Sequence, residues 1–139
     1  MKFKQILSVK KQALQNAELA LNKAKLKKTA IEQEFELVKK ELDTYPEPKT
    51  ILEIKLANEA IFFNLNKQKE LLEKISLCEK EIVHFTHLYK KASLDYEKIK
   101  YLHDEEIKKK KKEFEKKQAL ELDEIATMRF FAANQDINL

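Results

Sequence analysis

The sequence predicts an all-α protein: an elongated antiparallel two-helix coiled-coil hairpin, with a short helix or wide turn at its tip and a projecting C-terminal helix end. The chain has no glycine, and both of its prolines lie in the segment Tyr45–Thr50. Proline lacks a backbone N–H and disfavours the α conformation of the residue before it, so this pair ends a helix. Charged residues make up 37% of the chain, and apolar residues recur with a helical period on both sides of the break, as is typical of coiled coils.

The first helix is predicted over residues 3–44. Apolar side chains recur there in alternating steps of four and three residues, and Lys10 and Lys28 are the exceptions. A period of 3.5 residues held over this length predicts the seam of a coiled coil. The seam positions are Phe3, Leu7, Lys10, Leu14, Ala17, Leu21, Ala24, Lys28, Ile31, Phe35, Val38, Leu42 and Tyr45.

The proline break and the tip are predicted over residues 45–66. Thr50 followed by Glu53 has the form of a capping box, which predicts that a helix begins near Ile51. Ten of the fifteen residues 51–65 are apolar, more than one narrow seam needs. We therefore expect a short helix across the tip; the alternative is that the second long helix begins at residue 51. The run 61–63 either plugs the end of the coil or forms an exposed patch for a partner.

The second long helix is predicted over residues 67–132, and it is longer than the first. For this reason we expect its C-terminal end to project beyond the hairpin. After Ile99 the apolar pattern changes phase, so that His103, Ile107 and Phe114 fit only with a stutter, an inserted step that locally unwinds a coiled coil. The seam before the stutter is Ile75, Cys78, Ile82, Phe85, Tyr89, Ala92, Tyr96 and Ile99.

Two segments of the chain are strongly basic. Residues 1–30 carry eight lysines and one glutamate, and residues 108–117 carry seven lysines and two glutamates. The hairpin register places both segments at the same end, where they would attract an acidic partner. The run Lys108–Lys112 has no arginine, interleaved aromatic residue or groove-reading motif, which argues against base-specific recognition of nucleic acid. It could also be a solvated face whose lysine stems cover apolar surface.

The sequence predicts no catalytic, cofactor or metal site. Without glycine there is no loop that could cradle phosphate groups. Glu81, His84 and His87 resemble half of a di-iron site, but the second half is missing. Cys78 takes a seam position and has no activating neighbour. Neither a signal peptide nor a membrane-spanning segment is expected, which predicts a cytoplasmic protein. The missing catalytic and cofactor motifs predict that the protein is not an enzyme.

The C-terminal part of the second helix carries a short motif. Leu122, Ile125 and Arg129 share one face, and the motif reads Leu-Asp-Glu-Ile-Ala over residues 122–126, followed by Arg129 and Phe130. At the end of a lysine- and glutamate-rich helix, this motif resembles the flagellar type III export stalk proteins, the FliJ family. The resemblance implies a non-enzymatic antiparallel coiled coil, similar to the central stalk subunit of rotary ATPases.

The resemblance also implies partners. Family members insert their terminal ends into the ring of the flagellar export ATPase, contact the cytoplasmic domain of the membrane export gate, and act as escorts for export chaperones. The implied location is the cytoplasmic face of the inner membrane, reached through these partners. The ATPase-contact candidates that match the family motif are Leu122, Asp123, Glu124, Ile125 and Arg129. The gate-contact candidates, chosen for their expected exposure, are Phe62, Phe63, Leu65 and Leu72.

Two other functions remain open at the level of sequence. The chain could be a basic coiled coil that binds nucleic acid or an anionic membrane, or it could be a structural coiled coil that associates with itself. The first alternative predicts binding that weakens steeply with salt and depends on Lys108–Lys112. The second predicts a stable homodimer.

Overall fold

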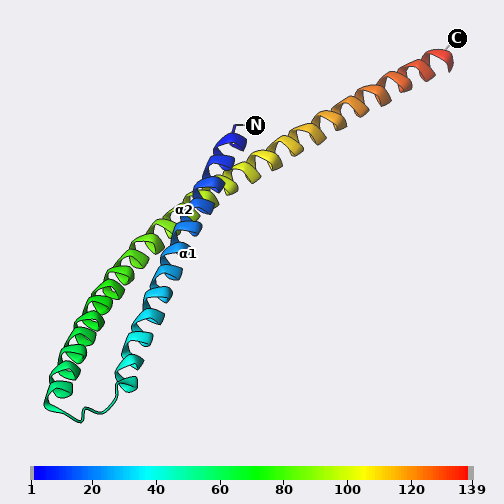
Figure 1. Cartoon of the computed structure of the whole chain (residues 1–139). Coiled ribbons are helices and arrows are strands. Elements are labelled where there is room, and N and C mark those ends of the chain that lie inside the picture. The colour runs from blue at the N-terminus through cyan, green and yellow to red at the C-terminus, as the bar shows by residue number, and fades with distance from the viewer. Residues whose placement is uncertain (1, 138–139) are drawn as a thin grey trace. The chain divides into compact units, whose positions relative to one another are not determined.

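The computed structural model describes residues 2–137, which form two long helices and a short connection (Figure 1). Helix α1 spans Lys4–Glu41 and helix α2 spans Ile51–Ile137. A single 3-10 turn, η1, covers Leu42–Thr44. The described residues contain no strand, so the predicted all-α class is confirmed.

In each of the two units of the chain, part of α1 pairs with part of α2 in antiparallel direction. In the unit 11–94, Lys28 lies beside Glu79, and Val38 lies beside Asn64. The other unit combines the first ten residues with the segment that begins at Asp95. In this second unit, Lys10 lies beside Asp95. Since residue numbers fall along α2 as they rise along α1, the predicted antiparallel hairpin is confirmed.

The predicted seam of α1 is confirmed at every position. All thirteen residues of the seam, from Phe3 to Tyr45, are buried or half-buried, whereas the residues between them are exposed, apart from Ala20. Leu21, Ala24 and Val38 are the most deeply buried residues of this helix. A strict 3.5-residue pattern thus marked the contact face correctly, because side chains with this spacing stay on one side of a supercoiled helix.

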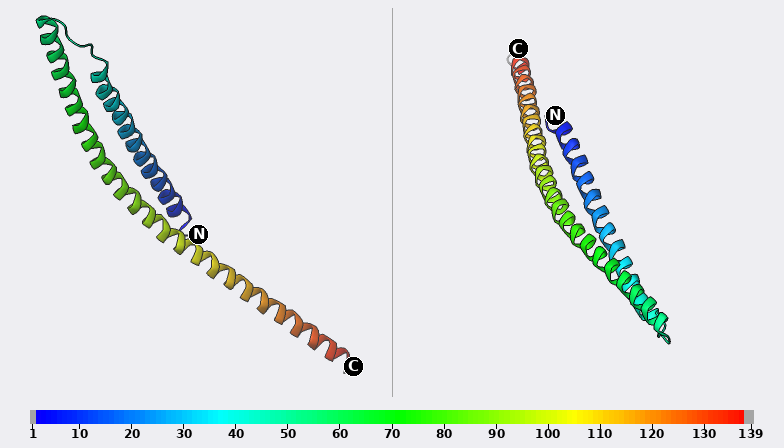
Figure 2. Two further views of the ribbon diagram at one scale, coloured as in Figure 1. Left: turned by 90° about the horizontal axis from the view of Figure 1, so that it is seen from below. Right: turned by 60° about the vertical axis from the view of Figure 1, so that its left-hand side comes forward.

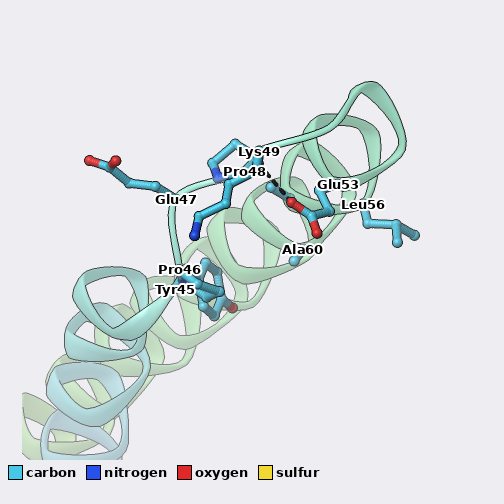
Figure 3. A pocket seen from close by; sticks show the side chains of 9 residues that line it. Tyr45, Pro46, Glu47, Pro48, Lys49, Glu53, Leu56 and Ala60 are labelled. Carbon is cyan, nitrogen blue, oxygen red and sulfur yellow. Dashed lines mark hydrogen bonds between the residues drawn. The ribbon is translucent and has the colours of Figure 1, made fainter.

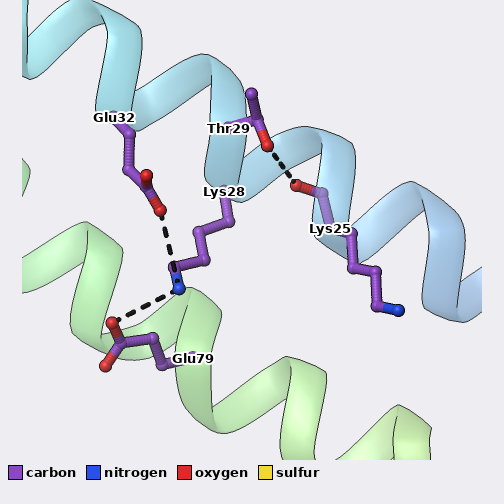
Figure 4. Close-up of polar contacts among 5 residues, drawn as sticks. All are labelled: Lys25, Lys28, Thr29, Glu32 and Glu79. Carbon is purple, nitrogen blue, oxygen red and sulfur yellow. Dashed lines mark hydrogen bonds and ion pairs between the residues drawn. The ribbon is translucent and has the colours of Figure 1, made fainter.

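The two lysines of the α1 seam are both paired with carboxylates of α2. Lys28 Nζ lies 3.5 Å from Glu79 Oε1, and it lies at the same distance from Glu32 Oε1 on its own helix (Figure 4). Lys10 Nζ lies 3.9 Å from Asp95 Oδ2. The aliphatic stems can cover the seam while the ammonium groups remain near water. Partly exposed pairs contribute only about 0–1 kcal/mol each, so their main effect is to favour this register over others.

Helix α2 begins at Ile51, so the prediction of a separate tip helix with a second long helix starting at residue 67 is wrong. The connection runs back along the first turns of α2 instead, where Tyr45–Lys49 line a hollow with Leu56, Ala57 and Ala60 (Figure 3). Extended chain advances about 3.3 Å per residue and a helix 1.5 Å, so the six residues 45–50 can cover about thirteen helical residues. The two half-buried alanines are small enough to lie beneath this strand-like segment.

The predicted capping box at the start of α2 is confirmed. Thr50 Oγ1 accepts a hydrogen bond of 3.1 Å from the Glu53 N–H. Glu53 Oε2 in turn accepts a hydrogen bond of 2.7 Å from the Lys49 N–H. The first bond satisfies an N–H group that the first helical turn cannot pair, and the second ties the residue before the N-cap to that turn. Together they explain why the helix begins directly after the proline segment.

The seam of α2 is longer than predicted and has no stutter after Ile99. Half-buried positions continue in the same alternation through His103 to Glu106. Ile107 and Phe114, which were assigned to the shifted seam, are 40% and 60% exposed. The reason is that α1 begins at Lys4 and offers no surface beyond this point. The alternation is interrupted instead near the start of α2. There the seam residues Ala60, Asn64 and Gln68, which are half-buried or buried, are separated by two consecutive steps of four residues.

Asn64 is the one buried polar residue among those described, and it fastens the end of α1 to α2. Its side chain is 2% exposed, and its Nδ2 donates to the Val38 carbonyl over 2.9 Å. That carbonyl lies in the last turn of α1, where helical carbonyls run out of N–H partners. Asn64 Oδ1 accepts from Gln68 Nε2 over 2.7 Å. A buried amide of this kind specifies register in coiled coils.

Glu106 supplies a negative charge at the N-terminus of α1. The first turn of α1 contains no acidic residue, although the helix dipole favours one there. Glu106 Oε1 accepts a hydrogen bond of 3.1 Å from the Lys2 backbone N–H and lies 3.7 Å from Lys110 Nζ. The bond from the Lys2 N–H lowers the pKa of Glu106 below its ordinary value, although partial burial opposes this shift. The carboxylate form is therefore favoured when α1 is docked.

Replacing the buried amide tests its role in the seam. We expect Asn64→Ala to lower the free energy of unfolding by about 1–3 kcal/mol, because the Val38 carbonyl then loses its donor in a buried position. Urea unfolding followed by circular dichroism at 222 nm measures this change. The exposed residue Asn66 provides a matched control, and Asn66→Ala should change the stability by less than about 0.5 kcal/mol. Equal effects of the two substitutions would contradict the assigned role.

The lowered pKa of Glu106 predicts a pH dependence. Its stabilising contribution is present above the pKa of an unfolded glutamate, about 4.3, and is lost as the pH falls through the lower folded value. We expect Glu106→Gln to speed hydrogen exchange of the amides in residues 4–10 at neutral pH, and to remove the acid-dependent part of that exchange. Glu105→Gln is the control, since this more exposed neighbour pairs only with Lys108. A wild-type protein whose residues 4–10 show no additional acid-dependent opening would refute the assignment.

Candidate protein-binding surfaces

Beyond Glu106, α2 continues without α1 beside it (Figure 2). Every residue from 107 to 135 is exposed, so the predicted projecting C-terminal end is confirmed. The five ATPase-contact candidates all lie in this segment. It combines a basic part, 108–117, with a part rich in apolar residues, 119–133. Both parts are available to a partner.

The ATPase-contact candidates do not form one cluster. Leu122, Ile125 and Arg129 follow each other at spacings of three and four residues, which places them along one face of α2. Asp123 and Glu124 lie on other sides of the helix. The Asp123 carbonyl also accepts a hydrogen bond of 2.8 Å from Thr127 Oγ1, a contact within the helix. The structure therefore brings the two apolar residues and the arginine together, and it separates the two acids from them.

The faces of this segment that the motif does not cover are apolar as well. Leu120, Met128, Phe130 and Phe131 are all more than half exposed, and they point in directions different from that of Ile125. The rings of Phe130 and Phe131 meet edge to face, with centroids 6.3 Å apart. None of these four was among the ATPase-contact candidates, although the paired phenylalanines were a readable signal. Large apolar side chains thus occur on every side of this segment, with the charged residues Glu121, Asp123, Glu124 and Arg129 between them.

The gate-contact candidates lie on α2 within the unit 11–94 and are all exposed. Leu65 and Leu72 are seven residues apart and share a face, and Phe62 is adjacent to Leu65 at a spacing of three. Phe63 lies on the opposite flank of the helix. The run 61–63 is exposed throughout, so it does not plug the end of the coil. The structure thus gathers three of the four candidates into one patch.

This patch is part of a longer apolar stripe. Ile51, Ile54 and Ile61 precede Leu65 and Leu72 with heptad spacing, and all five are exposed. We call these five residues the α2 stripe. It runs beside the seam with α1 without being covered by it. Three of its members, Ile51, Ile54 and Ile61, were not among the gate-contact candidates; a second heptad count starting at the capping box would have found them.

The chemistry of the described residues is that of binding surfaces. No group of three or more histidine, cysteine, aspartate or glutamate side chains in residues 2–137 is placed to hold a metal ion. Cys78 is buried in the seam, as its predicted seam position implied. No described helix contains an apolar stretch that could cross a membrane.

Comparison with models of protein families finds one match, described as flagellar FliJ protein, which covers residues 1–135. The matched region includes both helices and the exposed C-terminal segment. The chain matches no curated protein and no solved structure.

Proposed function

Because the chain belongs to the flagellar FliJ family, whose members are non-enzymatic components of the flagellar type III export apparatus, we propose that it is the stalk of that apparatus. In this role the free end of α2 inserts into the ring of the export ATPase. The hairpin links the ring to the export gate and escorts export chaperones. The protein works in the cytoplasm, at the cytoplasmic face of the inner membrane, and is held there by its partners.

The observation that supports insertion most strongly is the apolar surface on every side of residues 119–133. In water, each large apolar side chain left exposed forgoes about 1.5–3 kcal/mol of burial free energy. A flat partner could cover only one side of this helix. A ring of subunits around a central opening covers all sides at once, and this geometry fits the different directions of Ile125, Phe130 and Phe131.

The unequal faces of the inserted helix suggest how a stalk acts on a ring. Leu122, Ile125 and Arg129 form one face, whereas Asp123 and Glu124 point elsewhere. Identical subunits around the helix therefore meet different chemistry, and only one at a time faces the arginine. An asymmetric axle can in this way favour a different nucleotide state in each subunit, since a ligand shifts an equilibrium by its differential affinity for the two states.

The α2 stripe is the proposed contact with the export gate. It is apolar, exposed and located in the unit 11–94, whereas the proposed ATPase contact lies in the other unit. Phe62 extends it at one side. A helix packed along this stripe would follow the same heptad spacing as α1 and would form a third strand of a coiled coil.

The insertion proposal is tested by deleting residues 119–139. Since every described side chain in the deleted segment is exposed, we expect the seam and its helical signal to persist while binding to the purified export ATPase hexamer is lost. The point variant Ile125→Asp should weaken binding at least about tenfold, because it replaces buried apolar area with a charge. Isothermal titration calorimetry measures both.

A matched control shows whether the position of the introduced aspartate matters, or only its charge. Val83 is also an exposed aliphatic residue of α2, but it lies in the unit 11–94. Val83→Asp should bind the ATPase like the wild-type protein. Retained binding after the deletion would reject insertion of this segment.

The gate proposal is tested separately with Leu65→Asp. We expect this variant to bind the purified cytoplasmic domain of the gate about tenfold more weakly, and to bind the ATPase normally. The control is Leu77→Asp, because Leu77 is an exposed leucine of α2 outside the stripe. If the two leucine variants lose gate binding equally, the stripe is not the contact.

A further inference from the structure

The charge of α2 changes sign where α1 ends. Residues 2–10 carry three lysines and no acid, and residues 95–106 of α2 in the same unit carry five acids and two lysines. Directly beyond, residues 108–117 carry seven lysines and two glutamates. Acidic residues are thus placed where α1 presents lysines, whereas the basic segment is placed where α1 is absent. This layout leaves the positive charge of 108–117 without a counterpart in the pairing of the helices.

The local contacts leave most of this charge unpaired. Lys108 lies 3.7 Å from Glu105 and Lys110 lies 3.7 Å from Glu106. Among the described side chains, no carboxylate lies within 4.0 Å of Lys109, Lys111 or Lys112, and all three are exposed. Lys108, Lys109 and Lys112 also line a hollow that contains Lys2 and the two carboxylates Glu105 and Glu106. These two carboxylates are the ones that pair with Lys108 and Lys110.

The positive charge surrounds the helix. Five consecutive lysines exceed one helical turn of 3.6 residues, so Lys108–Lys112 point in all directions around the axis. The next segment, 119–133, carries large apolar side chains in all directions, with Glu121, Asp123, Glu124 and Arg129 between them. The free end of α2 therefore changes along its axis, from a segment with lysines on every side to a segment with apolar residues on every side. A helix that lies on a surface shows the opposite arrangement, with its charges on one side.

We propose that residues 108–117 form a basic collar that binds carboxylates lining the mouth of the ring protein around the helix end. This inference rests on the proposed insertion into the export ATPase and names the chemistry of its entrance. The collar lies just before the apolar segment, so it meets the mouth when the apolar segment is inside. Its charge accelerates insertion and sets the depth at which the helix stops.

Two other acidic partners fit the pattern less well. An anionic membrane would contact one side of the helix and leave the remaining lysines unused. Nucleic acid binding would also use one side, and the collar contains no arginine and one aromatic residue, Phe114, for stacking or base contact. A surrounding acidic protein uses every lysine of the collar.

The collar is tested by a triple variant in the full-length chain, with Lys109, Lys111 and Lys112 each changed to Gln. The matched control changes Lys67, Lys69 and Lys74, which are exposed lysines of α2 in the unit 11–94. Both variants have the same net charge. Stopped-flow binding to the assembled export ATPase hexamer is measured over a range of salt concentrations. Vesicles of phosphatidylglycerol and phosphatidylethanolamine, and a DNA duplex, serve as alternative ligands.

We expect the collar variant to associate with the ATPase about tenfold more slowly at low salt and with a shallower salt dependence, and the control to stay within about twofold of wild type. Equal slowing of both variants, or none in the collar variant, would overturn the collar while leaving insertion intact. A collar variant that loses binding only to vesicles or DNA would also overturn it. A wild-type chain that does not bind the ATPase would overturn the insertion proposal and the collar together.

Discussion

The register of the antiparallel seam is the constraint on which the rest of this structure depends, and the buried amide of Asn64 holds it. The amide donates to a carbonyl at the end of α1 that the helix itself cannot satisfy. Shifting α1 along α2 would leave that carbonyl without its donor and the amide without its acceptor, which costs more than a typical hydrogen bond contributes. The cross-helix ion pairs of Lys10 and Lys28 favour the same alignment.

The register decides which parts of α2 are free. With Val38 beside Asn64, the first turns of α2 extend past the end of α1, and the proline segment covers one side of them. In the other unit, the start of the chain lies beside Glu106 of α2, and residues 107–135 are exposed. The start of the α2 stripe, residues 51–61, belongs to the first overhang, whereas Leu65 and Leu72 lie beside the seam. The basic collar and the segment 119–133 lie beyond the last paired position of the other unit.

Sequence periodicity predicted the seam well and its ends poorly. All thirteen seam positions of α1 and the capping box at Thr50 are where the pattern places them, because both signals are local. The expected tip helix and the expected stutter after Ile99 were wrong for one common reason. In each case apolar residues outside the seam were assigned to the packing of the hairpin, whereas Ile61 and Phe114 are exposed. Periodicity identifies a face but not whether anything covers it.

The sequence by itself determined the two helices, the proline break and the residues of the α1 seam, because helix propensity, proline geometry and heptad spacing act over a few residues. It also contained the motif at Leu122–Arg129. Only the tertiary structure decided that α2 is continuous from Ile51, that Asn64 is buried, and that Glu106 marks the end of pairing. The last two features depend on the alignment of two segments far apart in the chain. That alignment is selected by contacts between the helices, which no local pattern in either helix specifies.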